Sequence, residues 1–530
     1  MDPAVELRET HTGIVMLCGD RVYKVKKSIT TDFLDFATTQ QRQRACTREI
    51  ELNRRLAPDI YLGLGHFTQP GKAPDEPVIV MRRLPEHTRL SRRLSDPGGE
   101  PVDLTALVDV LVDFHTTARR GPEIDRAGTA DALWGRWTVL LTSMRHRPPE
   151  ILDPALLHTI DTLVRHYLTG RQRLFEDRIA AGRMVDGHGD LLAEDIFELR
   201  DGFRILDCLD FDDDLRFVDC LDDIAFLAMD LQFLGHPEYA ADLIQTYQRR
   251  AADTAPASLA DHYIAYRALV RAKVDAIRAG QGDTGGGDRA HRHLQIAVEH
   301  LQASAVRLVL VGGLPGTGKS SLAAGLAEHT GAVVLSSDTV RAELRAAGDI
   351  AGDSGAYGRG AYSPENKQRV YTELLNRART LLDSGRSVIL DASWGDATER
   401  RRARALAHRT WARFAALRCV CPAPVAADRI RRRRHDPSEA TPRIAAALAA
   451  AADPWPEATD IDTGNRLDTA VSTACPVWDA LADDTDHSEP AQPPGSPPAQ
   501  PPRSSDAAVT GPVAERWAQR LLSKTGRGPA

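Results

Sequence analysis

Aromatic residues, cysteines and long apolar runs are all scarce in this chain of 530 residues. Only 5 % of the residues are aromatic, whereas proteins that stack nucleic-acid bases depend on such rings. The formal charge of −7 also disfavours a surface made to neutralise phosphate backbones, so a nucleic-acid partner is not expected. The seven cysteines are scattered and odd in number, which fits neither a disulfide framework nor a paired zinc site.

Membrane insertion is not expected either. No apolar run approaches the roughly 20 residues that a membrane-spanning helix needs, and the N-terminus opens with acidic and polar residues instead of a basic and then apolar signal. The sequence therefore predicts a cytoplasmic protein.

A chain of this length is too long for one hydrophobic core, so several domains are expected. The glycine-rich residues 279–288 separate two helical patterns, and we place the main division there. The predicted parts are a first domain over 1–278, a linker and connecting helix over 279–304, a second domain over 305–482, a disordered acidic and Pro-rich tail over 483–511, and a short C-terminal helix over 512–530. That last helix could dock on the body of the protein or on a protein partner.

The two halves differ in their apolar patterns. In the C-terminal half, the runs Leu308–Val311, Val333–Leu335 and Val388–Leu390 each precede a helical pattern, and Phe414–Val420 forms a fourth, mixed run. Such alternation predicts an α/β domain with a parallel sheet flanked by helices.

The N-terminal half begins with strands instead. Ile14–Leu17 and Val22–Lys26 surround Gly19-Asp20 as a hairpin, a helix is expected over 39–56, and the strand Val78–Met81 follows. The remainder of this half is mostly helical in pattern. We predict an α+β domain with a small sheet lobe and a helical lobe.

One motif carries specific chemistry in the C-terminal half. Residues 313–320 match G-x-x-x-x-G-K-[ST] between a predicted strand and a predicted helix, which directs backbone amides and the helix N-terminus toward bound phosphates. Lys319 is expected to reach the β and γ phosphates of ATP, and the Ser320 hydroxyl to ligate Mg²⁺. The predicted nucleotide-binding residues are Gly313, Leu314, Pro315, Gly316, Thr317, Gly318, Lys319, Ser320 and Ser321.

Charged residues follow the next strands of this half. Asp338 and Arg341 stand three apart after the second strand, where the acid can accept a substrate proton and the arginine can bind an anionic or polar substrate; a helix N-cap and a surface arginine are the alternative. Asp391 ends the third strand and could hold a magnesium-bound water or be structural. Arg429 and Arg433 belong to a basic run that is either a solvated face or a lid over the γ-phosphate.

These motifs together resemble small P-loop kinases of the gluconate kinase, polynucleotide kinase and zeta-toxin kind. The resemblance covers about residues 305–470 and rests on GGLPGTGKS, SSDTVR, VILDAS and the arginine run. It implies that Asp338 acts as a base on the substrate hydroxyl. It fixes ATP as the donor but leaves the acceptor open.

A second acidic segment lies in the N-terminal half, at residues 188–214. Asp201-Gly202 predicts a hairpin turn there, with Asp195 opposite Cys208 and close to Asp207. Two facing carboxylates repel unless a cation such as Mg²⁺ lies between them. Asp190, earlier in the loop, would be free to act as a base; an acidic solvent loop is the alternative.

This segment resembles the aminoglycoside phosphotransferase family, which has a protein-kinase-like bilobal fold. His188-Gly-Asp190 corresponds to its catalytic loop, and Leu206-Asp207-Cys208 to its metal-binding aspartate. The resemblance implies that a lysine of the early sheet holds ATP phosphates and pairs with a helix glutamate. Lys24 and Glu49 match these positions, and Lys26 on the same strand face is a rival.

Two departures from that family are visible: Asp195 stands where asparagine is usual, and no glycine-rich loop precedes the Lys24 strand. The whole chain resembles bacterial fusions of such a phosphotransferase-like domain with a P-loop kinase or ATP-binding domain. We expect an ATP-dependent phosphotransferase that acts on a hydroxyl of a small molecule. The alternatives are an ATP-binding regulatory protein with a weak or inactive N-terminal module, and a polynucleotide 5′-kinase.

Overall fold

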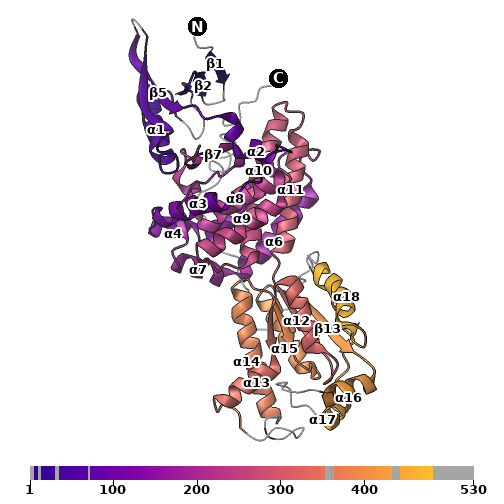
Figure 1. The fold of residues 1–530 in the computed structure, drawn as a ribbon. Helices are drawn as coiled ribbons and strands as arrows, with labels where there is room; N and C mark the ends of the chain where they lie inside the picture. The colour runs from indigo at the N-terminus through magenta and orange to yellow at the C-terminus, as the bar shows by residue number, and fades with distance from the viewer. Residues whose placement is uncertain are drawn as a thin grey trace.

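The computed structural model describes residues 5–9, 13–29, 35–69, 72–351, 360, 363–432 and 442–481. The expected disordered tail over 483–511, the expected helix over 512–530 and Arg433 lie outside these residues. Within them, the N-terminal sheet, a helical lobe and the C-terminal domain follow one another along the molecule (Figure 1).

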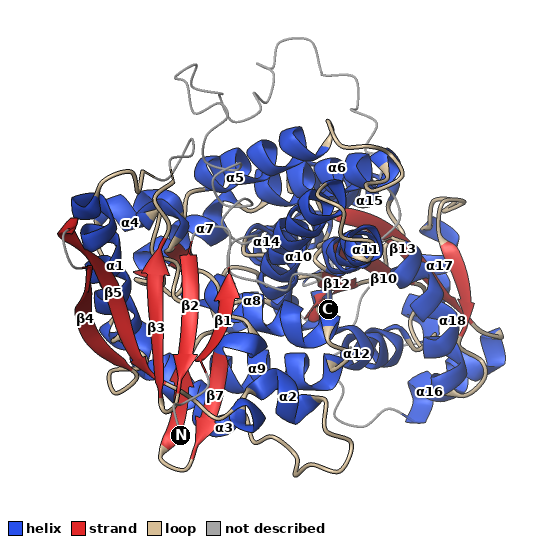
Figure 2. Cartoon of the chain, turned by 90° about the horizontal axis from the view of Figure 1, so that it is seen from above, coloured by secondary structure: helices blue, strands red, loops and turns tan. Residues whose placement is uncertain are grey.

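The N-terminal lobe is a five-stranded antiparallel sheet with one long helix against it (Figure 2). Its strands, in the spatial order β1-β2-β3-β5-β4, are β1 (Val5–Glu9), β2 (Gly13–Cys18), β3 (Arg21–Lys26), β5 (Lys72–Arg82) and β4 (Tyr61–Gln69). The predicted hairpin is confirmed, since Leu17 pairs with Val22 across the Gly19-Asp20 turn. The helix α1 (Thr39–Asn53) begins at a capping box in which Thr38 accepts a hydrogen bond from the backbone of Gln41.

The second lobe is almost entirely helical and buries the largest core of the protein. It comprises η1 (Glu86–Thr88), α2 (Leu90–Leu94), α3 (Thr105–Thr117), α4 (Pro122–Ala127), α5 (Ala130–Met144), α6 (Pro154–Gly170), α7 (Gln172–Ala180), α8 (Cys220–Phe233), α9 (Pro237–Arg250), α10 (Ala257–Gly280) and α11 (Gly286–Ala303). Between α7 and α8 lie β6 (Met184–Asp186), η2 (Ala193–Asp195), β7 (Ile196–Leu199), β8 (Gly202–Ile205), η3 (Asp213–Leu215) and β9 (Phe217–Asp219). Together with the sheet, this lobe gives the bilobal domain that the sequence predicts, with a small sheet lobe and a helical lobe.

The glycine-rich residues 279–288 are not a spacer between domains in this structure. They end α10, form a short turn and begin α11, and Leu294, Ala297 and Leu301 of α11 are buried in the core of the helical lobe. Apolar packing along α11 therefore extends the N-terminal domain beyond the expected division. We propose that the boundary follows Ala303.

The C-terminal domain is a parallel five-stranded sheet covered by helices on both faces, as the sequence predicts. The elements are β10 (Arg307–Gly312), α12 (Lys319–Thr330), β11 (Val333–Ser336), α13 (Ser337–Ala346), α14 (Pro364–Asp383), β12 (Val388–Asp391), α15 (Ala397–Arg409), β13 (Arg413–Val420), α16 (Ala423–Arg432), α17 (Pro442–Ala451), β14 (Thr459–Asp462) and α18 (Leu467–Ala480). The strands run in the order β11-β12-β10-β13-β14, all parallel. One apolar cluster lies under α14 and α15, and another under α12 and α18.

The two domains meet at the end of the parallel sheet where its strands begin. The Ser258 hydroxyl donates to the carbonyl of Gly385, 2.7 Å away, in the turn that precedes β12. Buried Arg171 donates to the carbonyl of Thr410, also at 2.7 Å, just before β13. The opposite end of the sheet, where these strands finish, is the edge at which sheets of this kind bind ligands.

Candidate functional site

The P-loop is a backbone cradle between β10 and α12. Gly316 and Gly318 adopt left-handed φ angles of 83° and 84°, which amino acids with side chains rarely adopt. A Cβ atom on Gly316 would stand 2.5 Å from the carbonyl oxygen of Ala426. Glycine is therefore required here for both its conformation and its size, and the loop amides gather at the first turn of α12.

Asp391 and Ser320 meet beside this loop. The Ser320 hydroxyl donates to Oδ2 of Asp391 at 2.7 Å. Asp391 is only 4 % exposed, and its Oδ1 is buried without a hydrogen-bond partner among the described residues. Burial raises the pKa of Asp391, although the Ser320 hydrogen bond and the Lys319 charge act in the opposite direction. A hydroxyl and an unsatisfied carboxylate oxygen fit Mg²⁺ or a water of its shell.

Lys319 lies at the surface of the loop. Its Nζ donates to the carbonyl of Leu314 at 3.2 Å, and no acidic side chain pairs with it among the described residues. Its charge is therefore available to a bound phosphate.

Asp338 and Arg341 form an ion pair on α13. The N-cap of this helix is Ser336, whose hydroxyl accepts from the Asp338 amide, so the Asp338 carboxylate is not used as a cap. Asp338 is close enough to Asp391 for its charge to raise the pKa of that carboxyl. The structure thus places Asp338, Arg341 and Asp391 at the same edge of the sheet as the P-loop.

Arg429 reaches the P-loop from α16. Its Nη2 donates to the carbonyl of Thr463 at 2.8 Å, and its Nη1 lies 3.5 Å from the position of a Cβ on Gly318. Thr463 in turn donates through its hydroxyl to the carbonyl of Thr317 at 2.5 Å. Sequence reasoning missed Thr463, which follows the short strand β14 and belongs to no motif.

The N-terminal domain assembles a second polar site. Lys24 Nζ lies 2.7 Å from Oε1 of Glu49 and 3.3 Å from Oδ1 of Asp207. Burial lowers the pKa of Lys24, but the charges of Asp207 and Glu49 outweigh it, and the pKa is raised well above its ordinary value. Asp207 has a left-handed φ of 64°, a conformation that is uncommon for residues other than glycine and that recurs at functional sites.

Lys26 also binds Glu49, but from the interior. Its Nζ lies 2.5 Å from Oε2 of Glu49 and 3.2 Å from Oδ2 of Asp210. The side chain of Lys26 is 3 % exposed, against 25 % for Lys24. Of the two rival lysines, only Lys24 is accessible to a nucleotide.

The predicted catalytic loop is anchored through its backbone. The amides of His188 and Gly189 donate to the two carboxylate oxygens of Asp223, at 2.7 and 2.9 Å, and Asp190 is buried. Despite its burial, Asp223 has a lowered pKa because His115 and His188 stabilise its charge. These contacts indicate that Asp223 is a structural acid that anchors the loop.

The hairpin register differs from the prediction. Ile196 pairs with Ile205 and Leu199 with Gly202, so the turn is Arg200-Asp201 and not Asp201-Gly202. Gly202 takes a φ of 116° and enters the second strand, which shifts the pairing by two residues. Asp195 therefore faces Leu206, whose amide donates to its carbonyl at 2.9 Å, and the expected pairing with Cys208 is wrong.

The described residues lack two further kinds of feature. No group of three or more His, Cys, Asp or Glu side chains is arranged among them to hold a metal ion. No helix in that part of the chain combines the length and apolar character needed to cross a membrane.

Comparisons with known proteins agree with this organisation. Residues 308–454 match the family described as AAA domain. The uncharacterized protein Rv2004c of Mycobacterium tuberculosis (strain H37Rv) is 47 % identical over 485 residues, which are 90 % of this chain and 96 % of that protein. The uncharacterized protein Mb2027c of Mycobacterium bovis gives the same values.

Solved structures resemble one domain at a time. A gluconokinase from Sinorhizobium meliloti is 17 % identical, covers 34 % of this chain and 95 % of its own, and has a TM-score of 0.27. A choline/ethanolamine kinase family protein from Mesorhizobium loti is 14 % identical, covers 56 % and 91 %, and has a TM-score of 0.35. The GDP complex of aminoglycoside 2′-phosphotransferase-IIIa is 13 % identical, covers 56 % and 93 %, and has a TM-score of 0.32. TM-scores of this size do not support an inference about activity.

Proposed function

This chain belongs to the same family as the mycobacterial proteins Rv2004c and Mb2027c, and we propose that it is an ATP-dependent phosphotransferase whose main site is the P-loop. In this proposal the acceptor is a hydroxyl of a small molecule. One observation carries it: the Ser320 hydroxyl donates to Asp391, which keeps one buried carboxylate oxygen unsatisfied beside the glycine cradle.

Each residue of this edge has a role in the proposal. The loop amides and Lys319 bind the ATP phosphates, while Ser320 and Asp391 would hold Mg²⁺, which screens phosphate charge when bound. Asp338 accepts the proton of the acceptor hydroxyl, and its ion pair with Arg341 fixes its orientation. Arg429, held against Thr463 beside Gly318, supplies positive charge over the loop.

The N-terminal domain is proposed as a second phosphotransferase site, with Lys24 and Glu49 for the nucleotide and Asp190 as base. Asp195 and Asp207 are the proposed magnesium-binding residues. Asp195, the last residue of η2, lies opposite Leu206, which directly precedes Asp207, and its carbonyl accepts from the Leu206 amide.

The test is a screen of hydroxylated metabolites and aminoglycosides for acceptor-dependent ADP release. The full chain is compared with Lys319→Ala, Asp338→Ala and Asp190→Ala. Activity that Lys319→Ala and Asp338→Ala both lose, and Asp190→Ala keeps, supports the P-loop as the main site. Acceptor-dependent release that survives Lys319→Ala but is lost in Asp190→Ala would move the activity to the N-terminal domain.

A regulatory role for the N-terminal domain is the second candidate. Lys24 also contacts Asp207, the carboxylate proposed for magnesium, so Mg·ATP must displace this contact to bind. In that case Asp190→Ala has no effect on turnover of any acceptor, while ATP binding at the P-loop is retained.

A further inference from the structure

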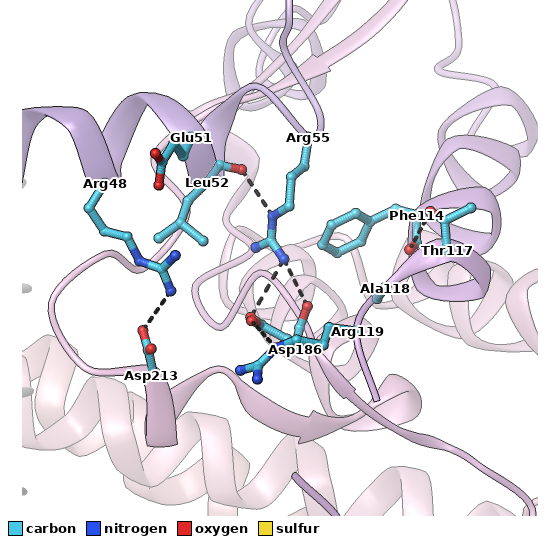
Figure 3. A pocket seen from close by; sticks show the side chains of 10 residues that line it. All are labelled: Arg48, Glu51, Leu52, Arg55, Phe114, Thr117, Ala118, Arg119, Asp186 and Asp213. Carbon is cyan, nitrogen blue, oxygen red and sulfur yellow. Dashed lines mark hydrogen bonds and ion pairs between the residues drawn. The ribbon is translucent and has the colours of Figure 1, made fainter. Parts of the chain in front are cut away.

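A cavity of about 640 Å³ lies beside the C-terminal end of α1 (Figure 3). This volume lies within the range of small-molecule sites. Its polar lining comes from α1, from the end of α3, and from the segments around Asp186 and Asp213. Glu49, which binds Lys24, does not line it, so the cavity is separate from the site already described.

Two of the three acidic residues that line this cavity, Asp186 and Asp213, form hydrogen bonds with arginines. Oδ1 of Asp186 accepts from Arg216 Nε at 2.8 Å, and Oδ1 of Asp213 accepts from Arg48 at 2.9 Å and from Arg216 at 2.6 Å. Arg216 is fully buried. Two of the three lining carboxylates are thus neutralised within the protein.

Two lining arginines keep donors that the protein does not use. A guanidinium has five N–H donors. Arg48 makes one hydrogen bond, to Asp213, and Arg119 makes one, to Glu123, with its Nε 3.6 Å from Asp186, as far as the described residues show. Their side chains are 39 % and 49 % exposed. The cavity therefore offers spare charged donors from two sides.

Arg55 connects the cavity to the catalytic loop. Its guanidinium donates to the carbonyls of Asp186 and Gly187, at 2.9 and 2.8 Å, and stacks 5.0 Å from the centre of the Phe114 ring. Gly187 directly precedes the loop that contains Asp190. A molecule in the cavity would contact the Arg55 guanidinium, which donates hydrogen bonds to the backbone just before this loop.

We propose that this cavity binds a small anion, a metabolite with a phosphate or carboxylate group, between Arg48 and Arg119. Both groups present several acceptor oxygens to guanidinium donors. Glu51, the third lining carboxylate, is exposed and has no ion pair in the described part of the chain. Its negative charge repels such a ligand, so removing that charge should raise the affinity. The proposal does not rest on the proposed phosphotransferase activity, because it concerns binding alone.

The test is calorimetric titration of the full chain with inorganic phosphate and with malonate at low ionic strength. All proteins carry Lys319→Ala, which removes the P-loop lysine as a competing phosphate ligand. We expect saturable binding of at least one probe, weakened about tenfold or more by Arg48→Gln and by Arg119→Gln, since each removes a charge-assisted hydrogen bond. Glu51→Gln should tighten binding. Arg92→Gln, which changes an exposed arginine on α2 that does not line the cavity, should leave it unchanged.

The variants change exposed side chains, and thermal unfolding checks that each remains folded. Binding of phosphate alone indicates a phosphate ester as the natural ligand, and binding of malonate alone indicates a carboxylate; either result supports the proposal. The proposal is overturned if neither probe binds saturably, if both arginine variants bind as the parent does, or if Glu51→Gln weakens binding.

Discussion

Replacing Gly316 by alanine tests whether the loop geometry, and not the presence of Lys319 alone, creates the nucleotide site. Gly316 has a φ of 83°, where alanine costs about 1–2 kcal/mol. The new Cβ would also stand 2.5 Å from the Ala426 carbonyl oxygen and 3.0 Å from Cγ1 of Ile430. Because the nearer neighbour is helix backbone and cannot rotate away, overpacking adds about 1–3 kcal/mol. We expect Gly316→Ala to destabilise the domain by about 2–5 kcal/mol in total.

Gly331, at the C-terminal end of α12, provides a matched control for Gly316 in the loop before that helix. It ends α12 with a φ of 70°, and a Cβ there would meet nothing within 4 Å. Gly331→Ala therefore carries the same conformational cost of about 1–2 kcal/mol without a collision. It lies at the far end of α12 from the loop and should leave ATP binding unchanged.

Urea unfolding and titration with Mg·ATP measure the two consequences. Gly316→Ala should weaken ATP binding by about tenfold or more, because displaced amides no longer converge on the phosphates. The reasoning is refuted if Gly316→Ala binds ATP as tightly as Gly331→Ala does. It is also refuted if the two variants lower the free energy of unfolding by the same amount, since the predicted collision between the new Cβ and α16 would then have no cost.

Three further predictions concern single charged groups. Asp391→Asn keeps an acceptor for Ser320 but removes the buried charge, so the magnesium dependence of ATP binding should weaken while the unfolding free energy is unchanged or higher. In a Lys319→Ala background, Lys24→Met should abolish residual ATP binding with little loss of stability, whereas Lys26→Met should cost about 3–5 kcal/mol on urea unfolding, because it removes the buried cation that lies between Glu49 and Asp210. Burial raises the pKa of Asp230 to about 6, so the folded state binds this proton more tightly than the unfolded state does. The free energy of unfolding should therefore fall as the pH rises from about 4 to 6. The fall should be below about 3 kcal/mol, because the side chain is only partly buried, and Asp230→Asn should remove it.

The C-terminal site was largely predictable because its information is local. Continuous apolar runs indicated the strands, and the carboxyl ends of parallel strands meet at one edge, so Ser320, Asp338 and Asp391 could be placed together from the sequence alone. Thr463 could not be found this way. Its contact with Thr317 spans 146 positions and depends on how β14 joins the sheet, which no short motif records.

The predictions for the N-terminal half differ from the structure where a glycine-containing segment is compatible with two local structures. Asp201-Gly202 predicts a two-residue turn, but a glycine at positive φ also fits the position after a turn, and the latter occurs here. The glycine-rich residues 279–288 likewise suit a flexible linker or a tight helix-to-helix turn. The apolar face of α11 packs into the core of the helical lobe, which favours the tight turn. Lys24 and Lys26 lie on the same strand face, and the greater exposure of Lys24 favours it as the nucleotide-binding lysine.

The contact between the domains limits how the two candidate sites could cooperate. Gly385 and Thr410, which touch the N-terminal domain, precede β12 and β13, whereas Asp391 ends β12 and the P-loop follows β10. The P-loop edge is therefore turned away from the domain contact. The sheet that carries Lys24 lies at the opposite end of the molecule from the C-terminal domain, with the helical lobe between them (Figure 1). A phosphate group cannot pass directly from one site to the other in this arrangement, so each site must take its substrates from solution. Any influence between them has to travel through the helical lobe, where buried Arg171 joins the end of α6 to the turn before β13.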